Sequence, residues 1–106
     1  MRSLTTVPDA MGESTDVLVP SDTCLAVVLP ANVPKAVPVP AGARHVLFSG
    51  TGNFWAKLGG PAVLPVTDML DGSAPELNPA GRELMGCGSI GLVAPGPCVV
   101  SLAFYG

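Results

Sequence analysis

The single histidine of this sequence belongs to the residue type that most often serves as a catalytic base at neutral pH. Nucleophilic catalysis needs a base beside the nucleophile, and His45 is the one imidazole available to activate Cys87 or Ser89. Ser89 lacks the G-x-S-x-G frame of a nucleophile elbow, because position 87 is a cysteine. The pattern favours a strand histidine with a satisfied hydrogen bond over a catalytic triad. We therefore expect the chain not to be an enzyme.

A glycine-rich run resembles a nucleotide-binding loop. Residues 86–91, Gly-Cys-Gly-Ser-Ile-Gly, match the pattern G-x-G-x-x-G. That loop binds dinucleotides because it follows a strand and opens a helix whose N-terminus faces the pyrophosphate. Pro95 lies shortly after the last glycine, so no such helix can form. We interpret these glycines as a passage from loop to strand with close backbone packing, and we expect no cofactor.

The residues that could hold a metal ion are scattered along the chain. The histidine and the cysteines lack the spacing of a structural zinc site, and Asp68 and Asp71 do not follow a calcium-loop pattern. We expect no metal site, and a solvated acidic loop at residues 68–71. Cys24, Cys87 and Cys98 each lie in an apolar run, which favours free thiols packed as small hydrophobes. A disulfide between Cys87 and Cys98 across a hairpin is the alternative.

Trp55, the only tryptophan, has the best case for a binding role. In residues 54–58 the side chains alternate, so that Phe54, Ala56 and Leu58 share one face while Trp55 and Lys57 share the other. An aromatic ring on a polar strand face suits a protein interface or a platform for a sugar. The alternative is a strand buried on both sides, with Trp55 in the core.

The composition restricts the elements that can position these residues. Among 106 residues there are 13 glycines and 12 prolines, and only 12% are charged, which leaves no room for long amphipathic helices. The 48% hydrophobic content argues against disorder. A net charge of −3 with five basic residues also argues against a nucleic-acid binder.

Six or seven short strands are predicted, with turn signals about every ten residues. The run at 23–29 is apolar on both faces and predicts a central strand, whereas the prolines in 35–40 predict an edge strand. Residues 50–53 are typical of a hairpin connection, and Asn78 with Pro79 predicts one helical turn within the irregular stretch 61–82. The remaining predicted strands are 44–49, 54–58, 89–93 and 98–105.

This pattern predicts an all-β fold for residues 23–106: a small antiparallel β-sandwich, jelly-roll-like, or a partly open barrel. Residues 1–22 form a polar, extended N-terminal arm that cannot bury enough surface to order itself, so it is either mobile or laid out along a partner. Neither a signal peptide nor a membrane helix is expected. The arm residues expected to make the contact are Val7, Pro8, Val17, Leu18 and Val19.

Four segments resemble small virion proteins of tailed bacteriophages. They are residues 37–49, 53–60, 71–79 and 99–105. The resemblance covers residues 23–106 loosely and leaves out the arm. It implies a compact β-sandwich that serves as a structural part of the particle, most closely a capsid decoration (cement) protein, with a tail or head–tail connector component as the alternative. It brings no catalytic residues.

The expectation that follows is a protein located in the virion, made in the host cytoplasm and bound to the major capsid protein. We expect a homotrimer at symmetry axes of the shell, with residues 1–22 contacting the capsid protein by adding a strand to an exposed sheet edge. Many copies would make weak single contacts strong in total. Neither nucleic acid nor membrane is an expected partner. A carbohydrate-binding module that uses Trp55 is the alternative from a different functional class.

Overall fold

The computed structural model describes residues 1–8 and 10–106, without the side chains of residues 14–16. The described residues form ten β-strands and no helix, which confirms the predicted all-β class. The strands are β1 (Thr6–Pro8), β2 (Ser14–Leu18), β3 (Thr23–Leu29), β4 (Lys35–Pro38), β5 (His45–Gly50), β6 (Trp55–Leu58), β7 (Glu76–Leu77), β8 (Gly81–Glu83), β9 (Ser89–Val93) and β10 (Cys98–Tyr105).

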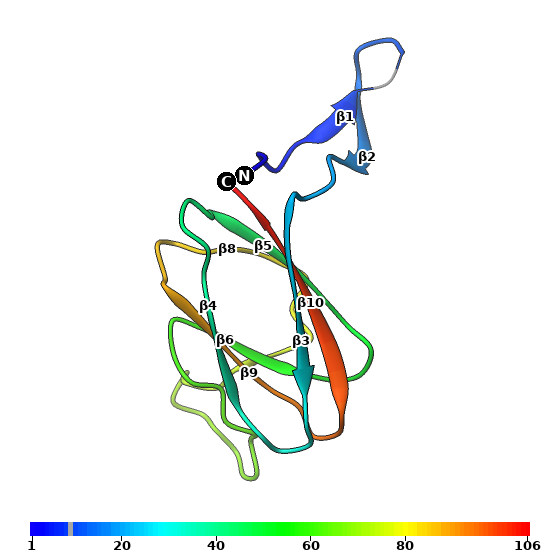
Figure 1. Cartoon of the computed structure of the whole chain (residues 1–106). Coiled ribbons are helices and arrows are strands. Elements are labelled where there is room, and N and C mark those ends of the chain that lie inside the picture. Colours follow the sequence, from blue (N-terminus) through cyan, green and yellow to red (C-terminus); the bar gives the residue numbers. More distant parts are fainter. Residues whose placement is uncertain (9) are drawn as a thin grey trace.

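Strands β3 to β10 form two four-stranded antiparallel sheets packed face to face (Figure 1). One sheet has the order β3-β10-β5-β8 and the other the order β4-β9-β6-β7. Every connection in the body crosses from one sheet to the other except the one between β6 and β7. This is the strand order of an eight-stranded jelly roll. The predicted β-sandwich is therefore confirmed, and the sheets do not close into a barrel.

The core lies between the two sheets and is made of alternate side chains of each strand. Phe48 is on β5 of one sheet, Phe54 directly precedes β6 of the other, and their ring centroids are 6.1 Å apart. On β10, Val100, Leu102 and Phe104 are fully buried, since this strand has neighbours on both sides. The predicted strands 23–29, 89–93 and 98–105 are confirmed with their boundaries.

Strand β3 is at the edge of its sheet, so the prediction of a central strand is wrong. Its burial alternates: Leu25 and Val27 point toward the core, while Cys24, Ala26 and Val28 are exposed. These outward-facing residues are small or apolar, yet they are exposed to solvent. An apolar run on both faces was therefore a misleading signal for burial on both faces.

Two connections also differ from the sequence-based expectation. Residues 50–53 carry the chain from one sheet to the other rather than joining a hairpin, because β5 and β6 belong to different sheets. Asn78 does not cap a helical turn. Its φ is positive, at 47°, and it lies between the short strands β7 and β8. There its Oδ1 accepts a hydrogen bond from Phe54 N–H.

The outward face of the second sheet is covered by the chain itself. The segment after β6 crosses directly over Gly91 on β9, and a Cβ atom at Gly91 would lie 2.6 Å from Ala62 N and closer still to Gly60 O. Ala62 is 1% exposed under this cover. Close backbone packing was the expected role of the glycines in 86–91, and it is confirmed for Gly91.

Candidate functional site

The N-terminal arm is a β-hairpin that projects from one end of the sandwich (Figure 1). Within the described residues, strands β1 and β2 pair with each other and with no other strand, with Thr6 opposite Leu18 and Pro8 opposite Ser14. The arm extends the molecule to 52 Å along its long axis, against 26 and 25 Å across. Within residues 1–22 the chain is folded back on itself as this hairpin rather than fully extended.

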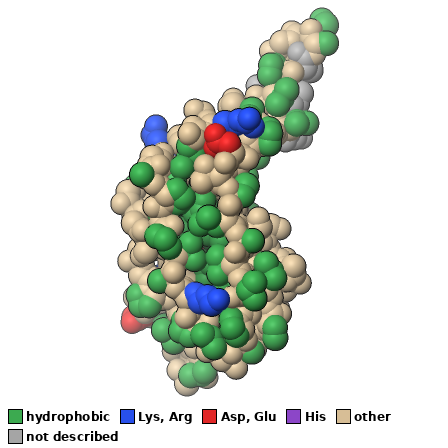
Figure 2. Space-filling model, viewed as in Figure 1, with side chains coloured by type: hydrophobic (Ala, Val, Ile, Leu, Met, Phe, Trp, Pro, Cys, Tyr) green, Lys and Arg blue, Asp and Glu red, His purple; other side chains and the backbone are tan. Residues whose placement is uncertain are grey.

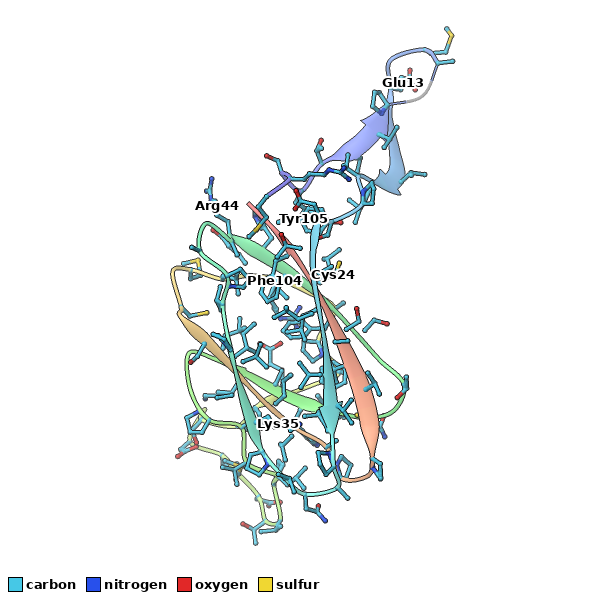
Figure 3. The ribbon with its side chains drawn as sticks, in the orientation of Figure 1. Glu13, Cys24, Lys35, Arg44, Phe104 and Tyr105 are labelled. Carbon is cyan, nitrogen blue, oxygen red and sulfur yellow. The ribbon has the colours of Figure 1, made fainter. Side chains whose placement is uncertain are left out.

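The base of the hairpin is fixed to the sandwich by hydrogen bonds to β10. The buried Tyr105 Oη donates to Val19 O at 2.8 Å, and Ser21 Oγ donates to Phe104 O at 2.7 Å. Gly106 N–H donates to Arg2 O at 2.8 Å, so the two ends of the chain meet here. Figure 3 shows Tyr105 and Phe104 at this junction, with Glu13 near the far tip of the hairpin.

Charged groups reinforce the same junction. Asp22 accepts hydrogen bonds from Arg2 N–H and from Thr23 Oγ1, and the Met1 ammonium lies 4.0 Å from its carboxylate. Desolvation alone would raise the pKa of Asp22. The hydrogen bonds from Arg2 N–H and Thr23 Oγ1, together with the positive charges of the N-terminus and Arg2, outweigh it and hold the pKa below its usual value of 3.8.

The predicted contact residues of the arm divide into two groups. Val7, Val17 and Leu18 are 40%, 62% and 39% exposed, and Pro8 is also exposed. Val19 is half-buried and belongs to the junction, where its N–H donates to Thr5 O. The hairpin therefore presents apolar side chains to solvent while its base is held by the body.

Trp55 and Lys57 lie together on the outward face of β6, as predicted, but neither side chain stands free on an open strand face. Both are half-buried. Trp55 lies between its cross-strand partners Leu77 and Val93, and Lys57 Nζ donates to Ser73 O at 2.8 Å in the long segment that follows β6. This face is partly covered. Trp55 is therefore neither on an open face, as a binding platform would be, nor fully buried, as a core residue would be.

The candidate catalytic residues are not brought together by any contact in the described part of the chain. His45 is on β5 in the first sheet, whereas Ser89 is on β9 in the second and Cys87 precedes it. His45 lies opposite Glu83 in the strand register, yet these two described side chains form neither a hydrogen bond nor an ion pair. No imidazole–nucleophile pair is formed among the described residues.

His45 does not have the satisfied hydrogen bonds that the sequence suggested. Its buried Nδ1 has no hydrogen-bond partner among the residues that the structure describes. The residue lines a cleft of about 190 Å³ together with Leu4 of the arm and Leu47. The imidazole therefore lies where the start of the arm meets the sheet.

The described residues contain no cluster that could hold a metal ion. Asp71 accepts hydrogen bonds from Ser73 Oγ at 2.6 Å and Ser73 N–H at 3.0 Å, and these bonds hold the pKa of Asp71 below its usual value of 3.8. All three cysteines are free, so the alternative of a Cys87–Cys98 disulfide is wrong. Cys98 is buried as expected, while Cys24 is exposed.

A cleft of about 400 Å³ next to the 50–53 connection was not anticipated from the sequence. Its polar lining includes Asn53 and Asn78. Asn78 Nδ2 donates to Asn53 Oδ1 at 3.0 Å, so the two amides bond to each other. Two asparagines beside glycine and proline are ordinary turn residues, so the sequence held no signal that they would meet.

The architecture defines the class of the protein as a small jelly roll that carries a hairpin arm. Comparisons with protein-family models, with curated proteins and with solved structures found no match. None of the described residues forms a helix that is long and apolar enough to cross a membrane. The resemblance to phage virion proteins accordingly stays a prediction.

Proposed function

We propose that this chain is a structural virion protein, a capsid decoration protein that binds the major capsid protein through its N-terminal arm. The observation that carries the proposal is the β1–β2 hairpin. An isolated two-stranded hairpin is marginally stable in water, and the described part of this one pairs with no strand of the body. Its base is nevertheless fixed by Tyr105 and Ser21. A binding segment that is held at its base and apolar at its surface suits attachment to a larger partner.

The body is compatible with this role, because it holds the base of the arm in place. The jelly roll occurs in viral capsid proteins, lectins and cupins, so the fold is compatible with a virion protein by analogy alone. On a symmetric shell many copies would bind together, so the weak contacts of single hairpins would sum to a stable attachment. A tail or connector component would use the same arm. The position of the protein on the particle distinguishes this alternative from a capsid decoration protein.

The test is binding of the full chain to empty shells of the major capsid protein, measured by co-sedimentation. The double variant Val17→Asp and Leu18→Asp places charges on the exposed surface of the hairpin, and we expect it to lose most binding. Val66→Asp is the matched control, because Val66 is 90% exposed on the segment after β6. Full occupancy of shells by the arm variant would overturn the proposal.

The carbohydrate-binding alternative predicts a different result. A sugar platform on Trp55 would give binding on a glycan array that Trp55→Ala abolishes, while shell binding would not depend on the arm. The half-buried position of Trp55 and the hydrogen bond of Lys57 to Ser73 O do not favour this alternative.

A further inference from the structure

Three of the four sheet edges of the body are protected against pairing with another chain. Strand β4 carries Lys35 and Pro38, β7 has only two residues, and β8 has three, including Arg82 and Glu83. Short length, charge and proline are the usual protections of an edge strand. Strand β3 has seven residues, with neither a charge nor a proline among them. It is the unprotected edge of the body.

The backbone groups on this edge can be assigned from the hydrogen bonds around Ser21. Ser21 Oγ accepts a hydrogen bond from Thr23 N–H, and its hydroxyl lies 3.0 Å from Thr23 O and 2.7 Å from Phe104 O. The backbone groups of Thr23 therefore face β10. Because successive residues of a strand alternate in direction, the N–H and C=O groups of Cys24 and Ala26 face away from the sheet.

Lys35 confirms this assignment. Its Nζ reaches from β4 and donates to Val28 O at 2.7 Å, so Val28 O also faces outward. Figure 3 shows Lys35 at this end of the molecule, with Cys24 toward the other end. Among the described residues, no hydrogen bond uses the outward backbone groups of Cys24 and Ala26. A strand that paired here would satisfy these groups without displacing Lys35.

An apolar strip runs beside the same edge. The core-facing side chains of β3, Leu25 and Val27, are only half-buried, whereas Val100 and Leu102 on the adjacent β10 are fully buried. Val39, which follows β4, is half-buried against the same core. Figure 2 shows hydrophobic side chains exposed along the middle of this face. A strand added to β3 would cover this strip as well as the edge.

We propose that β3 pairs in the antiparallel direction with β3 of a second copy, across a two-fold axis at Leu25. In this register the free backbone groups of Cys24 meet those of Ala26 in the second copy, and the two Leu25 side chains meet over the strip. An isologous contact must be self-complementary, and an uncharged strand with alternating apolar residues satisfies this requirement. The result is a dimer and not the trimer expected from the sequence.

The ends of the strand are also complementary under this rotation. Asp22 directly precedes β3, and Lys35 binds near its other end, so each Lys35 comes close to Asp22 of the second copy. The Met1 ammonium and Arg2 already offset part of the Asp22 charge, so backbone pairing and apolar contact supply most of the affinity. The arm is not needed for this contact, since its base is fixed at Val19 by Tyr105.

The first experiment is sedimentation equilibrium of the full chain. We expect twice the chain mass of 10.6 kDa, and loss of the dimer in Ala26→Pro, which removes an outward N–H without breaking a bond to β10. Ala36→Pro is the matched control: Val39 N–H donates to Gly88 O, so by alternation Ala36 N–H faces outward on the other sheet. Circular dichroism verifies that both variants fold. A wild-type monomer or trimer overturns the proposal.

Disulfide trapping tests the register independently of variant stability. Paired Cα atoms in such a register are about 5.5 Å apart, which a disulfide can span. Ala26→Cys should therefore cross-link to Cys24 of the second copy when diamide is added as oxidant. The same variant combined with Cys24→Ser should not cross-link, because the two introduced thiols, one at position 26 of each copy, are then diagonal across the strand pair. Cross-linking of the double variant alone would overturn the register.

These results are separable from the test of shell binding. This dimer does not rest on the proposed function, because it uses the edge of the body and not the arm. Ala26→Pro should still bind shells through the arm, whereas the arm variant should still form dimers. A negative result for dimer formation can therefore be interpreted separately from a negative result for shell binding.

Discussion

Replacing Gly91 by alanine is the sharpest test of how the second sheet is covered. A Cβ atom at this position would lie 2.6 Å from Ala62 N and 3.0 Å from Pro61 C, and closer still to Gly60 O. These are backbone atoms, which cannot rotate away as a flexible side chain would. Comfortable non-bonded contacts lie at about 3.5 Å, so the covering segment must move outward by about 1 Å.

The expected cost follows from this displacement. Overpacking a tight site costs about 1–3 kcal/mol, and a clash with three backbone atoms of the covering segment places Gly91→Ala at the upper end, about 3 kcal/mol. A loss of about 1 kcal/mol lowers the melting temperature of a domain of this size by about 4–8 °C, so we expect a drop of about 15 °C. That is a large fraction of the stability of a small domain.

The assay is thermal and urea unfolding of Gly91→Ala beside Gly88→Ala. Gly88 is in the same glycine-rich run, but a Cβ atom there would meet nothing within 4 Å and its φ is not positive, so this control should change the free energy of unfolding little. If Gly91→Ala unfolds at the wild-type temperature, the covering segment does not pack on β9.

Three further predictions concern the arm and the thiols. Tyr105→Phe removes the hydrogen bond to Val19 O, so we expect amide exchange at the base of the hairpin to become faster by an amount corresponding to about 1 kcal/mol, while the melting temperature of the body changes little. Because the pKa of Asp22 is lowered in the folded chain, its stabilising contacts are fully present above the usual pKa of 3.8 and are lost as the pH falls below it; chemical shifts of the arm should follow this titration, and Asp22→Asn should abolish it. The exposed Cys24 should react with Ellman's reagent in the native state, whereas the buried Cys98 should react only on unfolding, and rapid labelling of both would contradict the structure.

The strands that could be predicted from the sequence are those whose signal is local. Residues 98–105 alternate in a long run after a Pro-Gly-Pro turn, and residues 23–29 form an apolar run closed by Pro30, so both strands appear with the predicted limits. Strands β7 and β8 are short and polar. They exist because they pair with β6 and β5, and such pairing leaves no local pattern.

The position of a strand within its sheet was harder to predict. Cys24, Ala26 and Val28 suggested burial, but a residue type does not reveal whether another layer covers it. The exposed apolar residues of the arm followed from composition. The attachment of the arm's base to the body could not be predicted in this way, because the contact between Tyr105 and Val19 joins residues 86 positions apart.

The alternation of the chain between the two sheets has a consequence for how the protein is made. No two neighbours within the first sheet are consecutive in sequence, so neither half of the chain contains a complete layer. β10, the last of these strands to emerge from the ribosome, is the central neighbour of both β3 and β5. Productive folding of the first sheet must therefore wait for β10, and a chain cut short before residue 98 would lack the strand that holds this sheet together.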